Sequence, residues 1–181
     1  MISISYGAMV AFITAAWIAV RGCVALRTKS IRWKREAELI LVYICLIVVA
    51  RFTFCPFEKV NGQIQPLLFD PSRVFPPRIN MMPLVYLLDY LIVGEAVLNV
   101  VGNTAMFVPV GIIWPAVFKK LDSHKKVIAA GVGFSLSIEI LQLPFFDRVT
   151  DIDDLILNSA GFLIGYGIYL LVKKCKKKAS A

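Results

Sequence analysis

The chain has 181 residues, of which 59% are hydrophobic, and its mean hydropathy is +0.75. Soluble domains carry roughly 45–50% apolar residues, and a soluble protein of this size has too small a core to hide the excess. The composition therefore excludes an ordinary soluble domain, and the net charge of +8 has to be explained within a membrane protein.

Five segments are long and apolar enough to cross a bilayer as helices, which takes about 20 residues each. In chain order they are Met1–Val20, Ala37–Phe57, Ala96–Phe118, Val127–Phe146 and Leu155–Val172. The first segment is not expected to be a secretory signal, because it lacks a cationic start and its apolar stretch is too long. The sequence predicts an all-α, polytopic membrane protein with five transmembrane helices, forming a single membrane domain over residues 1–181.

A loop over residues 58–95 separates the second and third predicted spans. It is rich in proline, which favours irregular and partly extended backbone. Within it, Ile79–Gly94 is apolar but contains Pro83 and Asp89. We therefore expect this segment to be interfacial or re-entrant, and not to cross the membrane.

The basic residues predict the orientation of the chain. Fifteen of the 20 lie in three places: the segment Arg21–Arg35, the segment Lys119–Lys126 and the C-terminal segment Lys173–Lys178. These places alternate with the other side of a five-span protein, and basic residues remain on the cytoplasmic side. The N-terminus is therefore predicted outside and the C-terminus in the cytoplasm. This pattern is a topology signal, so no nucleic-acid partner is expected, whereas the terminal lysines are placed to touch anionic lipid head groups.

Polar residues recur within the last three predicted spans at helical spacing, and residues three or four apart share a helix face. The third span carries Asn99 and Asn103, the fourth Gly131, Ser135, Glu139 and Gln142, and the fifth Asp154, Asn158, Gly161 and Gly165. A rise of 1.5 Å per residue puts the amides and Glu139 at roughly 5–10 Å from the outer surface. The sequence therefore predicts a polar pocket that is shared by several helices and opens to the outer leaflet. Its predicted residues are Asn99, Asn103, Glu139, Gln142, Asp154 and Asn158, with Arg51, Arg148 and Asp151.

Simpler roles for these residues stay open. Amides often join membrane helices by hydrogen bonds without any chemistry, and Glu139 could form a structural ion pair with Arg51 or Arg148. The loop carbonyl and carboxylate oxygens near Asp151, Asp153 and Asp154 could bind a divalent cation, although the loop lacks the pattern of an EF-hand. An aspartate there could instead cap the last helix. No metal site and no cofactor are expected.

The polar segments resemble a known family. The runs NVVGNTAMFVPVGIIWP, EILQ and RVTDIDDLILNSAGFLIGY are similar, over about residues 40–172, to the VanZ-like family, which is named for the teicoplanin-resistance accessory protein of Gram-positive bacteria. The positions that carry this resemblance are Asn99, Gly102, Asn103, Phe107, Pro109, Gly111, Glu139, Gln142, Arg148, Asp151, Asp153, Asp154, Asn158, Gly161 and Gly165. The resemblance implies a multi-pass protein of the bacterial plasma membrane that lowers susceptibility to teicoplanin-type lipoglycopeptides.

Three mechanisms fit these residues. The pocket could bind a lipoglycopeptide or a lipid-linked cell-wall precursor without turnover. It could be an enzyme acting on an envelope lipid, with Glu139, Asp153 or Asp154 as general acid or base. It could also move a lipid or solute, with Glu139 as a proton-coupling carboxylate. In each case membrane lipids are expected partners.

Overall fold

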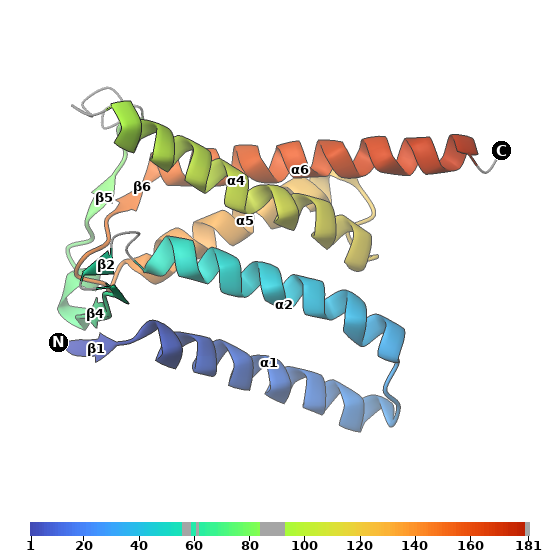
Figure 1. The fold of residues 1–181 in the computed structure, drawn as a ribbon, viewed down its shortest axis with the longest axis horizontal. Coiled ribbons are helices and arrows are strands. Elements are labelled where there is room, and N and C mark those ends of the chain that lie inside the picture. The colour runs from blue at the N-terminus through green and yellow to red at the C-terminus, as the bar shows by residue number, and fades with distance from the viewer. Residues whose placement is uncertain (56–58, 61, 84–92, 180–181) are drawn as a thin grey trace.

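The computed structural model describes residues 1–55, 59–60, 62–83 and 93–179. Five long helices dominate this part of the chain and run side by side as a bundle (Figure 1). They are α1 (Tyr6–Thr28), α2 (Trp33–Phe54), α4 (Val93–Val117), α5 (His124–Gln142) and α6 (Ile152–Ala179). The prediction of a helical membrane protein is confirmed at this level.

Within the described ranges, four helices are long and apolar enough to cross a membrane: α1, α2, Asn99–Val117 of α4, and α6. α5 is not among them, because Lys125, Lys126 and Glu139 lower its hydropathy. Its 19 residues still measure about 28 Å, close to the thickness of a hydrocarbon core. The count of five spans and the orientation of the chain stay predictions.

Short strands, which the all-α prediction did not include, gather at one end of the bundle (Figure 1). β1 (Ile2–Ile4) pairs antiparallel with β4 (Leu67–Phe69), and β2 (Lys59–Val60) pairs antiparallel with β3 (Gln63–Ile64). β5 (Ile79–Asn80) pairs in parallel with β6 (Thr150–Asp151). A 3-10 turn, Pro71–Val74, follows β4.

The strand β1 corrects the start of the first predicted span. Its first residues extend along Leu67–Phe69 instead of entering a helix. α1 begins at Tyr6, where the Ser5 hydroxyl accepts the Ala8 N–H at 3.2 Å and so caps the first turn. The helix then continues through Thr28, eight residues beyond the predicted end at Val20.

Two other boundary predictions are only partly covered by the structure. The end of the second predicted span, Pro56 and Phe57, lies outside the described residues. So does most of Ile79–Gly94, whose residues 84–92 are not described; of that segment, Ile79 and Asn80 form β5 and the last two residues begin α4.

Glycines allow α4 and α6 to touch through their backbones. A Cβ atom built on Gly161 would lie 2.0 Å from the Thr104 carbonyl oxygen, and one on Gly165 would lie 2.1 Å from that of Val108. No side chain fits at such distances, which is the close approach expected of a G-x-x-x-G step. The buried rings of Phe107 and Phe162 belong to the core beside this crossing.

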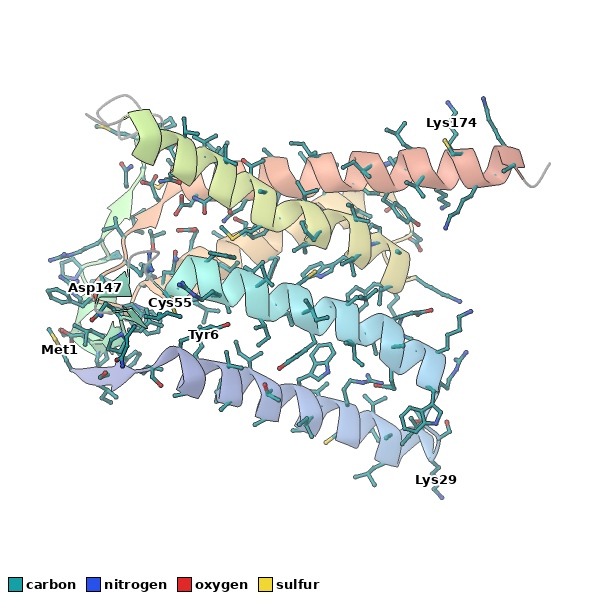
Figure 2. All side chains as sticks on the ribbon, in the orientation of Figure 1. Met1, Tyr6, Lys29, Cys55, Asp147 and Lys174 are labelled. Atoms are coloured by element: carbon teal, nitrogen blue, oxygen red, sulfur yellow. The ribbon has the colours of Figure 1, made fainter. Side chains whose placement is uncertain are left out.

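The two ends of the bundle differ in charge. Met1 and Asp147 lie at the end that carries the strands, whereas Lys29 and Lys174 lie at the opposite end (Figure 2). We call the first the acidic end; it comprises the strands and Asp147–Asp154. We call the second the basic end; it comprises the α1–α2 turn, residues 118–123 and the C-terminal lysines. The basic segments therefore gather at one end of the bundle, and the side of the membrane that this end faces stays a prediction.

Candidate functional site

The polar stripe of α5 faces the interior of the bundle. Gly131, Ser135, Glu139 and Gln142 are all buried, as their helical spacing predicts. The side chain of Glu139 is only 3% exposed. A charged group at membrane depth is costly to keep, so its partners decide what it does.

The carboxylate of Glu139 meets the strand β6 at the acidic end. Its Oε2 accepts the Asp151 N–H at 3.1 Å, and its backbone carbonyl accepts the Thr150 hydroxyl at 2.9 Å. The Asp151 carboxylate in turn accepts the Asn80 side-chain amide, at 3.1 Å from each oxygen. Because Asn80 and Asp151 are paired residues of β5 and β6, the short parallel ladder holds Asp151 against Glu139.

A second set of polar contacts joins α4 to α6. The Asn103 amide nitrogen donates to Asn99 Oδ1 and to Asp154 Oδ1, each at 2.6 Å. The glycine contacts about two and three turns further along α6 bring the two helices close enough for this bond. Asp151 and Asp154 both lie near enough for their charges to act on Glu139. We call Glu139, Asp151, Asp153 and Asp154 the carboxylate cluster.

The arginines predicted for the site serve the end of α2. Arg148 donates from Nε and Nη2 to the Phe54 carbonyl at 3.1 and 2.9 Å, and Arg51 donates to the Cys55 carbonyl at 3.2 Å. Cations there satisfy last-turn carbonyls and complement the helix dipole. Burial lowers the pKa of the Arg148 guanidinium, while the nearby carboxylates, Asp154 among them, act in the opposite direction.

The structure does not join Glu139 to an arginine. Between residues of the described ranges, ion pairs form only between Arg21 and Glu36, Arg35 and Glu38, and Lys126 and Asp122. The ion pair considered for Glu139 is therefore not formed with Arg51 or Arg148. Glu139 relies instead on the Asp151 N–H.

Three further predicted residues are buried: Asp153 within the carboxylate cluster, and Gln142 and Asn158. Gln142 donates from Nε2 to the Thr53 carbonyl at 2.6 Å, which ties α5 to α2. Asp153 donates its N–H to Asp151 Oδ1 at 2.9 Å. Asn158 is 1% exposed, and its Oδ1, like Gln142 Oε1, accepts no hydrogen bond within the described part of the chain. Buried acceptors without a donor are costly, so these two oxygens are available to a ligand or water.

The divalent-cation hypothesis has no geometric support among the described residues, where no group of three His, Cys, Asp or Glu side chains is arranged to hold a metal ion. Asp151 already accepts the Asn80 amide and the Asp153 N–H. Asp154 accepts Asn103. The oxygens of Asp151 and Asp154 that accept these bonds therefore hold β5, the start of α6 and α4 together.

An apolar groove lies between α2 and α4. It has a volume of about 470 Å³ and is lined by Leu41, Ile44, Cys45, Val48, Phe52, Gly102, Ala105, Met106, Pro109 and Ile113. From Phe52 to Leu41 it extends about 16 Å along α2. At the acidic end it begins beside Thr53 and Asn103, which bond to Gln142 and Asp154. On both helices, the residue next in sequence to this end of the groove therefore belongs to the polar contacts.

Sequence reasoning missed Asn80, Thr150 and the carbonyls at the end of α2. Asn80 lies in the proline-rich loop, 71 residues from Asp151, and two-residue strands leave no periodic pattern that could reveal their pairing. Thr150 is a loop threonine by its local context. One signal could have suggested helix capping. Arg148 is a cation that the predicted topology places on the same side of the membrane as the end of the second span.

Comparison with known proteins adds three findings. A family model described as VanZ/LLP1 matches residues 40–173. The uncharacterized membrane protein YwnJ of Bacillus subtilis (strain 168) is 32% identical over 89 residues, 49% of this chain and 60% of that protein. Protein VanZ of Enterococcus faecium is 33% identical over 76 residues, 42% of this chain and 47% of that protein. The chain thus spans about half of these curated relatives, and no solved structure matches it.

Proposed function

This chain belongs to the VanZ/LLP1 family, and we propose that it lowers susceptibility to teicoplanin-type lipoglycopeptides by binding an amphiphilic envelope ligand. The ligand is either the lipoglycopeptide itself or a lipid-linked cell-wall precursor. The polar part of the ligand would meet the carboxylate cluster and its amides, and an acyl chain would occupy the groove between α2 and α4.

One observation carries this proposal: an apolar groove of about 470 Å³ ends, on both of its helices, one residue away from groups that bond to Gln142 and Asp154. Amphiphiles combine the same two parts. The unpartnered oxygens of Gln142 and Asn158 could accept hydrogen bonds from hydroxyl or amide groups, which are abundant in glycopeptides and in sugar-containing precursors. The predicted orientation would put this end of the bundle on the outer side of the plasma membrane, where both ligands are exposed.

The groove gives a direct test. Ala105 lines it, and Ala105→Leu would fill part of its volume without adding a polar atom. Ala116 lies on the same helix and is exposed, but does not line the groove, so Ala116→Leu is the matched control. In a strain without other members of the family, we expect Ala105→Leu to lower the inhibitory concentration of teicoplanin and Ala116→Leu to leave it unchanged.

Protein abundance in the membrane has to be measured beside each inhibitory concentration. If Ala105→Leu and Ala116→Leu protected equally well, and as well as the original chain, at equal abundance, the groove would take no part in the mechanism. Loss of protection by both would show a general effect of bulk on α4.

An enzymatic role is the second candidate, and the burial of Glu139 beside Asp151 and Asp154 favours it. Enclosed carboxyl groups that share a site are suited to general acid and base work. Mass spectrometry of envelope lipids and cell-wall precursors, with and without expression of the protein, separates the two functions. A new or missing species would support the enzyme, and unchanged species with full protection would support binding.

Transport of a lipid or solute, with Glu139 as the coupling carboxylate, is the third candidate. Its distinguishing result would be ligand movement across the bilayer of reconstituted vesicles that depends on a proton gradient. Binding without movement would leave the first proposal in place.

A further inference from the structure

The basic end of the bundle contains a second cavity, independent of the function proposed above. It has a volume of about 550 Å³ and is lined by Arg32, Lys34, Arg35, Glu38, Phe118, Lys119 and Lys120. The lining comes from two separate parts of the chain, the start of α2 and the segment that follows α4. Five cationic side chains against one carboxylate leave a strongly positive hollow.

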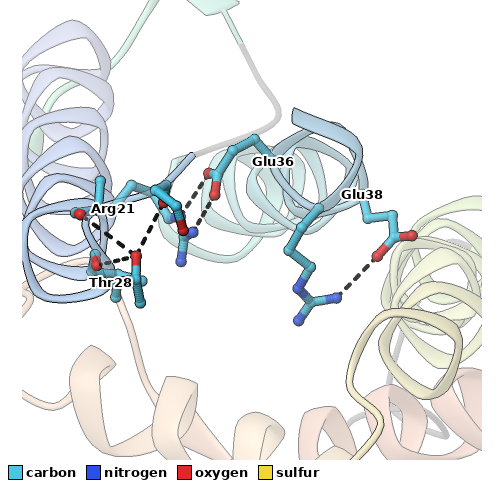
Figure 3. Close-up of polar contacts among 8 residues, drawn as sticks. Arg21, Thr28, Glu36 and Glu38 are labelled. Atoms are coloured by element: carbon cyan, nitrogen blue, oxygen red, sulfur yellow. Dashed lines mark hydrogen bonds and ion pairs between the residues drawn. The ribbon is translucent and has the colours of Figure 1, made fainter. Parts of the chain in front are cut away.

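Arg35 fixes the shape of this cavity. Its guanidinium pairs with Glu38 at 3.1 Å and also donates to the Val117 carbonyl, and it lies 5.9 Å from the centre of the Phe118 ring. Glu38, labelled in Figure 3, thus neutralises the arginine that ties α2 to α4. Glu38 does not pair with the other four cationic side chains that line the cavity.

Arg32, Lys34, Lys119 and Lys120 form no ion pair with any acidic side chain that the structure describes. The nearby carboxylate of Glu36 is engaged by Arg21 (Figure 3). In addition, the start of α2 has no side-chain cap among the described residues, and the first N–H groups of a helix form the positive end of its dipole. Four cationic side chains without a described acidic partner therefore line one cavity, and two of them, Arg32 and Lys34, belong to the uncapped start of α2.

From this arrangement we infer that the cavity binds a phosphate ester, and that its source is the head group of an anionic phospholipid. Basic pockets between membrane helices on the cytoplasmic side bind such head groups. The apolar residues next to the cavity support a lipid over a soluble ligand: Ile31 and Trp33 are exposed at the same turn, and tryptophan is enriched where membrane and water meet.

Native mass spectrometry of the full chain in a neutral detergent tests this inference, because the detergent removes the general attraction of a charged membrane. Phosphatidylglycerol and phosphatidylcholine are the two lipid probes. We expect one phosphatidylglycerol to be retained per protein, and phosphatidylcholine to be retained far less.

The decisive variant is K34Q/K119Q/K120Q, and its charge-matched control is K174Q/K177Q/K178Q at the same end of the bundle but outside the cavity. Since each basic residue near a lipid surface contributes on the order of 1 kcal/mol, the cavity variant should bind phosphatidylglycerol at least about tenfold more weakly. The control should bind within about twofold of the original chain. K34R/K119R/K120R keeps the charges and should retain binding.

Three results would overturn the inference. Equal loss in the cavity variant and its control would mean that overall charge alone attracts the lipid. No preference for phosphatidylglycerol would exclude an anionic head-group site. Displacement of the lipid by inorganic phosphate at similar concentration would assign the cavity to a soluble anion. Thermal unfolding of each variant confirms that the comparison is made between folded proteins.

Discussion

The carboxylate of Glu139 is almost fully enclosed, accepts one backbone N–H from Asp151, and has two aspartates as neighbouring charges. A side chain that served packing alone would need no charge in that position. An alanine or leucine would avoid the cost of enclosing a carboxylate. At the residue scale, Glu139 is therefore the group on which a functional role rests most directly.

Replacing Glu139 by glutamine tests this role. The amide oxygen can still accept the Asp151 N–H, so Glu139→Gln should insert and accumulate normally. Protection against teicoplanin should nevertheless fall to that of cells lacking the protein, since the charge and the titratable proton are gone. Membrane abundance and inhibitory concentration are the two measurements. Ser135→Ala, one turn away on the same buried face, is the control and should protect fully.

A Glu139→Gln protein that is present at normal level and protects as well as the original chain would show that the carboxylate takes no part in the mechanism.

Arg148 has a different role, because its guanidinium caps the end of α2 through two bonds to the Phe54 carbonyl. Arg148→Met leaves that carbonyl unsatisfied and should lower the free energy of unfolding by about 1–3 kcal/mol. Arg148→Lys keeps the charge but loses the fork of donors, and should fall in between. Thermal unfolding in detergent measures both, with Arg78→Met, an exposed arginine at the same end, as control. Equal stability of all three variants would contradict a capping role.

At the scale of elements, the crossing of α4 and α6 positions Asn103 against Asp154. Gly161 and Gly165 make it possible, because a Cβ atom at either place would overlap a carbonyl oxygen of α4. Gly167, two residues further along α6, has no atom within 4 Å of such a Cβ. The helix therefore carries its own matched control.

Gly161→Ala and Gly165→Ala should each force the helices apart and lower stability by about 1–3 kcal/mol, with loss of teicoplanin protection as Asn103 moves from Asp154. Gly167→Ala should change neither quantity. Unfolding in detergent and inhibitory concentrations provide the measurements. If Gly161→Ala were as stable and protective as Gly167→Ala, the close crossing would not be needed.

Sequence patterns predict the helices of this fold but not the pairing of its short strands. The helices and the buried stripe of α5 follow from local periodicity, and the glycines of α6 signal a close crossing before any partner is known. The strands β5 and β6 are too short to have a period, and they pair residues 71 positions apart. Because Asp151 reaches Glu139 through that pairing, the contact that defines the carboxylate cluster was beyond sequence reasoning. Arg148 was predicted near the site, but its bond to a backbone carbonyl depends on where α2 ends.

At the scale of the whole molecule, backbone bonds at the acidic end tie together segments from both halves of the chain. β1 pairs with β4, the Asp70 N–H donates to the Pro144 carbonyl at 2.8 Å, and the Thr150 N–H donates to the Arg78 carbonyl at 3.2 Å. These contacts require the N-terminus, the loop near Asp70 and the end of α5 to lie on one side of the membrane.

Reporter fusions test that requirement together with the predicted orientation. A reporter active only outside should work at the N-terminus and near Asp70, and one active only in the cytoplasm should work at the C-terminus. Such a result requires an odd number of crossings after Asp70, and so includes α5 as a span when α4 and α6 both cross. Activity of the cytoplasmic reporter near Asp70, or of the outside reporter at the C-terminus, would refute the five-span arrangement.

The pairing of β5 with β6 also sets an order of events during synthesis. Asn80 and Asn103 leave the ribosome long before Asp151 and Asp154, which emerge only as the last helix begins. Until residues 150–154 have been made, Glu139 has neither its backbone donor nor its acidic neighbours, and Asn103 has no Asp154 carboxylate to bond. The cluster is thus completed last, and a nascent chain halted before residue 150 would carry Glu139 and Asn103 without these partners.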